Sequence, residues 1–579
     1  MQTKKELGIY TFQAVVKNSL KRFASRACCG FPDEVPLTYA QVCQKITETQ
    51  ALMHALGVER GATVGIFARN SPSWIIAYLA IVTYGGIAVP LLPDFNSEEV
   101  RSSLEHAEAK FLFIGSNVLN KAPENVETVI LLDNFSVVRS KVQLPENYSL
   151  ENALFENTYV ATEDDVSTII YTSGTTGRSK GVVLTNRNLI SNAVSGQYCY
   201  RVYKYDVTLS ILPLAHVYEF TVGFLMMFMN GARIVYLAGP PIPSILMPTL
   251  KLVRPNIMLA VPLIMEKIYK SQVVPALNKT PLRKKLLKIW LFKKIFYRIA
   301  GAKIKKALGG RIQFFGLGGS KLDTEIEKFL KIAGFPYAIG YGLTETSPLL
   351  AYSGPRNTKP GSIGFAAHGV ELKIIDKNSE GVGELVAKGE NVMQGYYKSP
   401  ELTAAAFTED GYFRTGDLFS EGKNGRLSIR GRLKSVILDA SGENIYPEDI
   451  EFVLNQHEIV RESLVVEGEN SSLTAIIQFN DEKLKKFEAE EKARLESQTI
   501  KDKVDTAISA VSENLSSVQE RLLDEIKLFV NARVNPRSKI QKVEAVDEFE
   551  KTASGKIKRY LYGFFGKKTD SKNKRENLK

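Results

Sequence analysis

The sequence predicts an α/β fold of several domains, and three observations support this prediction. Before about residue 360, short apolar runs alternate with helical patterns, which is typical of parallel sheets covered by helices. From about Ser362 the expected strands become shorter and are separated by glycines, which indicates a smaller β-rich subdomain. After Arg432 the pattern becomes α+β and includes a long polar helical stretch from about Glu482 to Val530.

The strands of the large N-terminal part are expected where apolar residues cluster without helical spacing. These runs are Leu112-Phe-Ile-Gly, Val129-Ile-Leu-Leu-Asp, Thr168-Ile-Ile-Tyr-Thr, Ile234-Val-Tyr-Leu and Ile312-Gln-Phe-Phe. In the β-rich part the corresponding runs are Gly383-Glu-Leu-Val-Ala and Leu427-Ser-Ile-Arg.

An uncharged stretch from Ser71 to Pro93 resembles a membrane span at first sight. Gly85-Gly86 and Pro90 interrupt it, so the helix is too short to cross a bilayer. The pattern instead predicts a buried helix, a glycine turn and a buried strand at 87–90.

Composition places the chain among globular proteins, with 44% hydrophobic and 24% charged residues in 579 positions. Four cysteines do not form a disulfide framework, which favours a reducing compartment. The N-terminus lacks the apolar stretch of a secretory signal. We therefore expect a cytoplasmic protein, with possible peripheral attachment to the inner face of a membrane. The net charge of +12 fits either an anionic partner or simple solubility.

The residues from Tyr171 to Gly181 form the most informative segment of the chain. They read Tyr-Thr-Ser-Gly-Thr-Thr-Gly-Arg-Ser-Lys-Gly and follow an expected strand. Backbone N–H groups and hydroxyls of such a loop can surround phosphate oxygens, and Lys180 adds positive charge. It is not a Walker A loop, because Arg178 follows Gly177 where that loop has lysine.

This loop resembles the signature of the adenylate-forming superfamily, which includes acyl-CoA synthetases, peptide-synthetase adenylation domains and firefly luciferases. Further segments of the chain match that superfamily in order, from about residue 10 to 560. They are Leu212-Pro-Leu-Ala-His-Val-Tyr-Glu219, Gly340-Tyr-Gly-Leu-Thr-Glu-Thr346, Tyr412-Phe-Arg-Thr-Gly-Asp417, Gly431-Arg-Leu-Lys434, Ser441-Gly-Glu-Asn-Ile-Tyr-Pro-Glu-Asp-Ile-Glu451 and Lys551-Thr-Ala-Ser-Gly-Lys-Ile-Lys558.

The resemblance implies an N-terminal AMP-binding domain at 1–432 and a mobile C-terminal domain at 433–565. The charged, apolar-poor composition of the last residues predicts a disordered basic tail at 566–579. It also implies ATP, Mg²⁺ and CoA as cofactor and co-substrates. The β and γ phosphates of ATP would be held by Thr172, Ser173, Gly174, Thr175, Thr176, Gly177 and Lys180.

The resemblance assigns the remaining nucleotide contacts to five residues. Glu345 would ligate Mg²⁺, and Thr344 would hydrogen-bond the α-phosphate. Tyr341, followed by Gly342, would lie against the adenine. Asp417 would accept hydrogen bonds from the ribose hydroxyls, with Arg432 reinforcing the ribose or phosphate.

Three further positions have dynamic or catalytic roles in the superfamily. Lys556 is expected on a loop that swings over the nucleotide and bridges the carboxylate and the α-phosphate. Lys434 matches the hinge between the two domains. His216 is expected to line the acyl pocket.

The match around His216, together with Val261-Pro-Leu-Ile-Met-Glu-Lys-Ile, is most similar to the long-chain fatty acid branch of the superfamily. The apolar run from Phe220 to Met229 could line a hydrophobic tunnel or form a core helix. The leading hypothesis is therefore a long-chain fatty acid–CoA ligase.

The positive charge is concentrated between Glu266 and Asp323, where there is no acidic residue. Residues 279–306 form a basic, partly amphipathic stretch that suggests an anionic membrane surface as partner. On a helical wheel one face carries Leu282, Leu286, Ile289, Trp290, Phe296, Tyr297 and Ile304, interrupted by Lys293, while Leu291 and Ile295 fall elsewhere. A helical hairpin packed on the body with solvated lysines fits the pattern equally well. Nucleic acid is not expected as a partner, since no binding module accompanies the charge.

Other functions remain open from the sequence. An acyl-ACP synthetase would transfer the acyl group to acyl carrier protein, and a fatty acyl-AMP ligase would stop at the adenylate. A luciferase-type oxygenase also begins with an adenylate. An inactive membrane-associated scaffold would have lost catalytic positions, yet the matching residues are present here.

Overall fold

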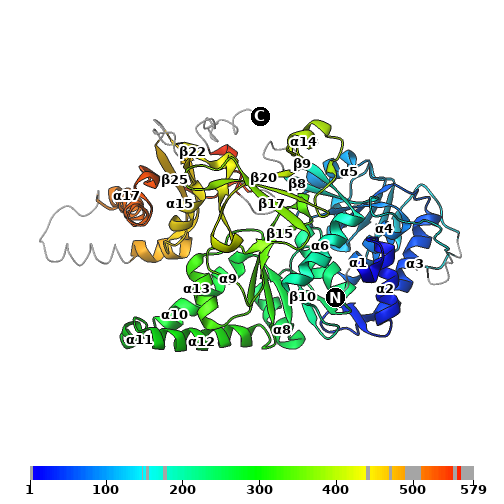
Figure 1. Ribbon diagram of the computed structural model, residues 1–579, viewed down its shortest axis with the longest axis horizontal. Coiled ribbons are helices and arrows are strands. Elements are labelled where there is room, and N and C mark those ends of the chain that lie inside the picture. Colours follow the sequence, from blue (N-terminus) through cyan, green and yellow to red (C-terminus); the bar gives the residue numbers. More distant parts are fainter. Residues whose placement is uncertain are drawn as a thin grey trace, which may run out of the picture. The chain divides into compact units, whose positions relative to one another are not determined.

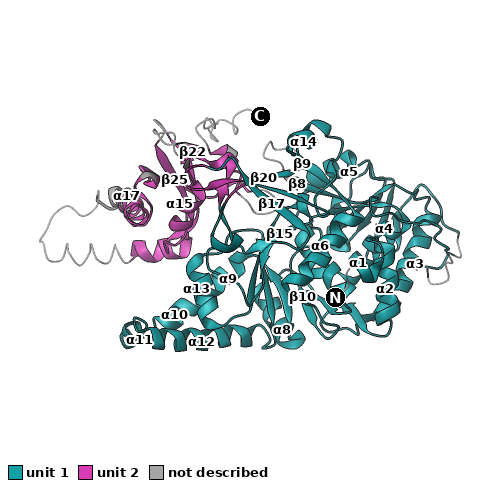
Figure 2. Ribbon diagram, in the orientation of Figure 1, with its two compact units in different colours: residues 1–377, 385–415, 420–429 teal, residues 378–384, 416–419, 430–579 magenta. Residues whose placement is uncertain are grey.

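The computed structural model of the protein describes residues 4–145, 148–150, 155–173, 179–438, 444–468, 472–489, 510–551 and 557–562 (Figure 1). Contacts divide the chain into two compact units (Figure 2). Unit 1 comprises residues 1–377, 385–415 and 420–429, and unit 2 comprises residues 378–384, 416–419 and 430–579. The predicted α/β class is confirmed, whereas the domain boundaries at 432 and 565 remain predictions. The expected tail at 566–579 lies outside the described residues.

An eight-stranded sheet in unit 1 has the order β19-β9-β8-β4-β3-β5-β6-β7. Its centre, from β8 to β6, is parallel, and the outer pairs β8–β9, β9–β19 and β6–β7 are antiparallel. The strands are β3 (Thr63–Phe67), β4 (Ile87–Leu91), β5 (Phe111–Ile114), β6 (Thr128–Leu131), β7 (Val137–Arg139), β8 (Val166–Ser173), β9 (Ser179–Thr185) and β19 (Gly395–Tyr396).

A nine-stranded sheet in the same unit has the order β16-β15-β14-β13-β12-β10-β11-β1-β2. The strands from β14 to β1 pair in parallel, and the pairs β14–β15, β15–β16 and β1–β2 are antiparallel. The strands are β1 (Ala27–Gly30), β2 (Leu37–Thr38), β10 (Val207–Ser210), β11 (Arg233–Tyr236), β12 (Ile257–Ala260), β13 (Phe314–Leu317), β14 (Tyr337–Gly342), β15 (Leu349–Ser353) and β16 (Phe365–Ala366).

Helices connect the strands of both sheets (Figure 1). The α-helices are α1 (Lys4–Leu7), α2 (Phe12–Phe23), α3 (Tyr39–Ala55), α4 (Pro72–Tyr84), α5 (Ser97–His106), α6 (Asn186–Cys199), α7 (Met226–Met229), α8 (Pro243–Val253), α9 (Pro262–Ile268), α10 (Val274–Leu277), α11 (Pro281–Leu286), α12 (Trp290–Ala307), α13 (Thr324–Ala333) and α14 (Pro400–Ala405). Two π-helical segments, η3 (Glu219–Leu225) and η4 (Tyr269–Val273), precede α7 and α10.

The uncharged stretch after Ser71 forms the predicted helix, turn and strand. The Ser71 side chain accepts a hydrogen bond from the Trp74 N–H, and Pro72 occupies the first turn of α4, where its missing N–H is tolerated. Residues 74–84 are all buried, and Gly85 ends the helix with a φ of 99°, a conformation that favours glycine. Within the described part of the chain, every helix is too short or too polar to cross a membrane.

The expected β-rich segment contains a four-stranded sheet in the order β17-β18-β20-β21. Its strands are β17 (Val370–Ile375), β18 (Val382–Gly389), β20 (Phe413–Glu421) and β21 (Leu427–Arg432).

Beyond residue 432, unit 2 is α+β, as predicted. Strands β24 (Val460–Glu467), β25 (Leu473–Phe479) and β26 (Lys542–Val546) form one sheet, and β22 (Ile437–Leu438) pairs with β23 (Asn444–Ile445). Its helices include α15 (Pro447–Leu454), residues 481–489 and α17 (Ala510–Asn531). Leu522, Ile526 and Val530 of α17 are buried in the unit's core, because their four-residue spacing places them on one helix face.

Candidate active site

The glycine- and threonine-rich loop lies at the end of the β8–β9 hairpin. Thr172 pairs with Lys180 and Ser173 with Ser179, so the two strands hold the ends of the loop together. The predicted ligands Gly174, Thr175, Thr176 and Gly177 lie outside the described residues. In strand β8, the Tyr171 hydroxyl lies 2.8 Å from His106 Nδ1, and burial raises the pKa of Tyr171.

Lys180, Tyr396 and Glu345 come together beside this hairpin. The Lys180 ammonium lies 4.8 Å from the centre of the Tyr396 ring, a cation–π distance. The Tyr396 hydroxyl donates a hydrogen bond of 3.0 Å to Glu345 Oε1. Burial, and next the negative charge of Glu345, raise the pKa of Tyr396. The predicted phosphate ligand Lys180 therefore lies against the ring of Tyr396, and the predicted metal ligand Glu345 binds the hydroxyl of the same residue.

Two buried asparagines hold the segment that carries Thr344 and Glu345. The Nδ2 groups of Asn192 and Asn391 both donate to the carbonyl oxygens of Thr346 and Leu349, and Leu349 N–H donates to Asn192 Oδ1. Because both amides are buried, these bonds are shielded from competing water. The segment is thus fixed from two separate parts of unit 1.

Gly342 at the end of β14 permits the close approach of this segment. A Cβ atom at this position would lie 1.7 Å from the carbonyl oxygen of Pro348, which no side chain could tolerate. Tyr341 precedes it and is half-buried. The glycine therefore serves the backbone geometry of the turn, in addition to any contact with a nucleotide.

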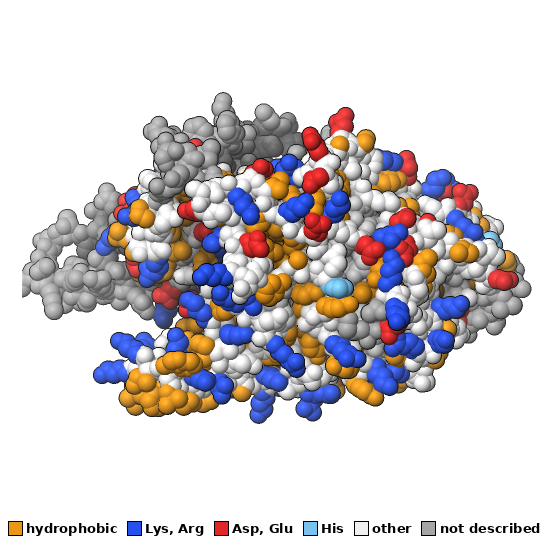
Figure 3. All heavy atoms as spheres, viewed as in Figure 1, with side chains coloured by type: hydrophobic (Ala, Val, Ile, Leu, Met, Phe, Trp, Pro, Cys, Tyr) orange, Lys and Arg blue, Asp and Glu red, His pale blue; other side chains and the backbone are white. Residues whose placement is uncertain are grey.

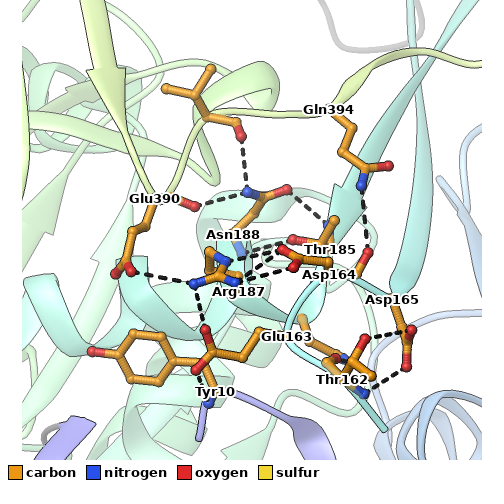
Figure 4. A network of polar contacts seen from close by, with 12 residues as sticks. Tyr10, Thr162, Glu163, Asp164, Asp165, Thr185, Arg187, Asn188, Glu390 and Gln394 are labelled. Atoms are coloured by element: carbon orange, nitrogen blue, oxygen red, sulfur yellow. Dashed lines mark hydrogen bonds and ion pairs between the residues drawn. The ribbon is translucent and has the colours of Figure 1, made fainter.

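A polar network fixes the start of helix α6 to the segment before β19 (Figure 4). Arg187 forms ion pairs with Glu163, Asp164 and Glu390, and the side-chain amide of Asn188 donates 2.8 Å bonds to the carbonyls of Glu390 and Val392. Strand β9 is followed by α6, and residue 392 lies just before β19. The network therefore supports the pairing of β9 with β19, which brings Lys180 to Tyr396. We infer that it positions the site without belonging to it.

A small apolar pocket of about 20 Å³ is lined on one side by β14, including Gly340, the residue before Tyr341. Helical residues Tyr218, Val222 and Met226 line one side, and Gly316 and Gly340 line the strand side. The run from Phe220 to Met229 is fully buried in η3 and α7, so the interpretation as a core helix is confirmed, while part of the same helix faces the pocket.

His216 is half-buried and lies three positions before the start of η3. Its backbone carbonyl accepts a hydrogen bond from the Phe220 N–H. The expected role of His216 in the acyl pocket remains a prediction.

Glu219 is a buried carboxyl group at the start of η3. Its side chain is 1% exposed, and burial raises the pKa of Glu219 to about 8, although a hydrogen bond from Ser210 acts in the opposite direction. Gly223 leaves room for this carboxyl group, since a Cβ there would lie 2.6 Å from it. Burial therefore favours the protonated form of Glu219 at neutral pH.

Glu219→Gln is expected to stabilise the protein increasingly as the pH rises from 5 to 8. The folded state keeps a proton that the unfolded chain releases above its ordinary pKa of 4.5, so the contribution of Glu219 to the free energy of unfolding falls between pH 4.5 and 8. Glutamine has no such proton. Thermal unfolding of both proteins across this range measures the effect, and a constant difference in Tm would show that Glu219 is ionised in the folded protein.

The predicted ribose ligand Asp417 is held within unit 2. Its side chain is only 4% exposed, and Arg432 Nε lies 3.1 Å from Asp417 Oδ1. Because Arg432 is more than half exposed, its guanidinium can also reach solvent or an anion. Lys434, the expected hinge, is exposed in a short 3-10 turn at Leu433–Ser435. Lys556 lies outside the described residues.

Comparison with known proteins decides the family. The family described as AMP-binding enzyme matches residues 16–397 of this chain, which is more than half of it. The chain belongs to the AMP-binding enzyme family. Long chain acyl-CoA synthetase 6, peroxisomal, of Arabidopsis thaliana is 30% identical over 475 residues, covering 75% of this chain and 67% of that protein. Long-chain-fatty-acid–CoA ligase 5 of Rattus norvegicus is 30% identical over 472 residues, with coverages of 74% and 68%.

Solved structures show the same fold. ATP-bound MatB from Rhodopseudomonas palustris superposes with a TM-score of 0.73 at 20% identity and covers 96% of this chain and 99% of that one. The o-succinylbenzoate CoA synthetase MenE from Bacillus subtilis, in complex with its acyl-adenylate intermediate, has a TM-score of 0.72 at 22% identity, with coverages of 94% and 97%. The arrangement of sheets in this chain is therefore that of AMP-binding enzymes.

In this AMP-binding enzyme, described residues that precede and follow Lys556 in the sequence make contacts within unit 2. Lys551 and Ile557 form an antiparallel bridge. Arg559 then binds Glu451 through Nη2 at 2.7 and 2.9 Å and the carbonyl of Val465 through Nη1 at 2.9 Å. Burial raises the pKa of Glu451 to about 7, and the charge of Arg559 opposes this shift.

Arg559→Met is expected to destabilise unit 2 by about 2 kcal/mol and to slow adenylate formation, because it leaves Glu451 buried without its cation. Arg559→Met/Glu451→Gln should recover part of the stability, since it removes both charges and keeps an acceptor for the Val465 N–H. Thermal unfolding and pyrophosphate release measured on both variants separate the two effects. Wild-type rates in the double variant would show that the ion pair does not position the Lys556 segment.

Sequence reasoning missed Tyr396, Asn192 and Asn391. Tyr396 follows a glycine in an ordinary strand pattern, and the asparagines lie on a helix and a turn where polar residues are common. Only the pairing of β19 with β9 and the packing of α6 beneath residues 346–349 bring them to the site.

Proposed function

We propose that this AMP-binding enzyme activates a long-chain fatty acid as acyl-AMP with release of pyrophosphate, and then transfers the acyl group to CoA. The observation that carries the proposal is the Lys180–Tyr396–Glu345 cluster in the same unit as an apolar pocket that ends beside Tyr341. The long-chain acyl-CoA synthetases among the relatives support the choice of substrate and acceptor.

The charges of the cluster fit ATP and a magnesium ion. Lys180 supplies a cation for phosphate oxygens. Tyr396 binds Glu345 through Oε1, which leaves the other carboxylate oxygen, Oε2, for a metal ion. A carboxylate is a preferred ligand of Mg²⁺, which would neutralise phosphate charge when bound. Tyr396 would hold Glu345 in place, so that the carboxylate does not swing onto Lys180.

The active site would bring two anions together, the fatty acid carboxylate and the α-phosphate of ATP. A fatty acid carboxylate must approach the α-phosphate, so the enzyme mainly positions the reactants and compensates their charge. Thr344 would donate to the α-phosphate, and the ionised carboxylate needs no general base. Within unit 2, Asp417 would accept from the ribose hydroxyls, with Arg432 beside it.

The acyl chain would enter the apolar pocket between η3 and β14. A volume of about 20 Å³ is far below the several hundred Å³ of an ordinary ligand site, so a long chain requires the pocket to widen. Met226 lines the pocket, and a change in its rotamer would widen the pocket, because its unbranched thioether side chain adopts many rotamers at low cost.

Val222→Phe is expected to shift the substrate preference to shorter acids. Val222 is buried in η3 and lines the pocket, so a larger ring would block the path of a long chain while leaving the nucleotide site intact. We expect roughly tenfold loss of kcat/KM for long acids and little change for short ones. Val202→Ile, a buried change outside the pocket lining, is the control. An equal loss at every chain length would place the acyl chain elsewhere.

The acceptor is tested by offering CoA and acyl carrier protein to the purified enzyme with ATP and radiolabelled fatty acid. We expect acyl-CoA as the dominant product. Abundant acyl-carrier protein without acyl-CoA would indicate an acyl-ACP synthetase, and accumulation of acyl-AMP with both acceptors would indicate a fatty acyl-AMP ligase. Absence of all three products would favour an inactive scaffold.

A further inference from the structure

Helices α11 and α12 expose an apolar surface that unit 1 does not cover. The exposed fractions are 67% for Leu282, 60% for Trp290 and 63% for Leu291. Ile289, Phe292, Ile295 and Ile299 are also exposed. Figure 3 shows hydrophobic side chains gathered over these helices, with Lys and Arg side chains beside them. We call the set Leu282, Ile289, Trp290, Leu291, Phe292, Ile295 and Ile299 the apolar stripe.

The stripe is distinct from the face by which α12 packs onto unit 1. Phe296, Tyr297, Ala300 and Ile304 contact the buried core around Phe329. Leu291, Ile295 and Ile299 follow one another at four-residue spacing and therefore form a second, outward row. The single wheel face expected from the sequence is thus wrong, because Phe296, Tyr297 and Ile304 are packed while Leu282, Ile289 and Trp290 are exposed. Leu291 and Ile295 lie off the packed face, as expected.

The surroundings of the stripe are strongly basic. Residues 279–306 contain eleven lysines and arginines and no acidic residue. Lys284, Lys285 and Lys288 are exposed beside the α11 part, and Arg298 lies between Ile295 and Ile299. Among the described residues, none of the eleven cations has a carboxylate partner within ion-pair distance. Their charge is therefore available to an external anion.

We propose that the apolar stripe docks this protein onto an anionic lipid bilayer. The apolar side chains of the stripe would insert at the boundary between headgroups and acyl chains, and the surrounding lysines would bind the headgroups of anionic lipids. Nucleic acid would use the lysines but leave seven apolar side chains in water. A second copy of this chain would bring two basic surfaces together without counter-charge. The inference concerns attachment and holds independently of the proposed reaction.

Vesicle flotation of the full-length protein tests the attachment. We expect binding to vesicles of phosphatidylcholine with phosphatidylglycerol, weaker binding to phosphatidylcholine alone, and loss of binding at high salt. Leu291→Glu/Ile295→Glu should weaken binding at least about tenfold. Val35→Glu/Val160→Glu is the matched control, because these valines are highly exposed elsewhere and the charge change is the same. Equal binding by both double variants would overturn the proposal.

Trp290 offers a direct probe of insertion. The chain has two tryptophans, and Trp74 is fully buried, so brominated lipid should quench the fluorescence of Trp290 alone. Trp290→Phe should still float with anionic vesicles but lose the quenching. Flotation of the wild type without any quenching would overturn insertion of the stripe. A wild type that fails to float, and that forms a dimer dissociated by Leu291→Glu/Ile295→Glu, would assign the stripe to a second copy instead.

Discussion

Lys556→Ala is expected to lower the rate of acyl-adenylate formation by about 10²–10³, while thioester formation from supplied acyl-AMP changes little. The estimate corresponds to about 2.7–4 kcal/mol, as for loss of one donor that acts on developing charge. By resemblance to the family, Lys556 would bridge the carboxylate and the α-phosphate in the first step and would move away before the second. Single-turnover measurements of the two half-reactions check the prediction. The control is Lys558→Ala, which removes a neighbouring lysine whose Nζ lies 3.8 Å from Glu550.

The opposite kinetic pattern is expected for the hinge. Lys434→Pro should restrict the backbone of the Leu433–Ser435 turn and spare adenylation more than thioester formation. Equal loss of both half-reactions in Lys556→Ala would show that the lysine is structural. A first step that is slowed more than the second in Lys434→Pro would contradict the hinge assignment.

Glu345→Gln is expected to lower kcat/KM for ATP by about 10², and to raise the magnesium concentration required for half-maximal rate. The amide keeps the shape of the side chain but removes the negative charge that would bind the ion. Magnesium titrations of wild type and variant measure both effects. Glu409→Gln neutralises an exposed carboxylate outside the cluster and should leave the titration unchanged.

Tyr396→Phe separates positioning from binding in the same cluster. It removes the 3.0 Å hydrogen bond to Glu345 and keeps the ring beneath Lys180. A hydrogen bond to a charged group contributes about 1.5–3 kcal/mol, so we expect a loss of roughly tenfold to a hundredfold, smaller than for Glu345→Gln. A larger loss in Tyr396→Phe than in Glu345→Gln would show that the tyrosine, and not the carboxylate, is the essential group.

Much of the fold could be predicted because its signals are local. The segment at 71–91 combines an N-cap serine, a proline in the first turn, an apolar helix and a glycine terminator, and each acts on its immediate neighbours. The strands at 111–114 and 128–131 are short apolar runs whose only stable environment is a buried sheet. The order of the motifs in the chain then indicated the family.

The unpredicted features depend on contacts between distant residues. Tyr396 and Glu345 are separated by 51 positions, and neither has a local pattern that points to the other. The wheel prediction for residues 282–304 fails for a related reason. It treats the stretch as one helix, whereas α11 ends at Leu286 and α12 begins at Trp290, so Leu282 and Ile289 are exposed while Phe296 and Ile304 are packed.

The most direct test of the account is fatty-acid-dependent exchange of labelled pyrophosphate into ATP, measured with magnesium and without CoA. The account predicts exchange with long-chain acids, because Lys180, Glu345 and Lys556 would support reversible adenylation before any thiol binds. Absence of exchange with every fatty acid offered, from a folded protein, would contradict it.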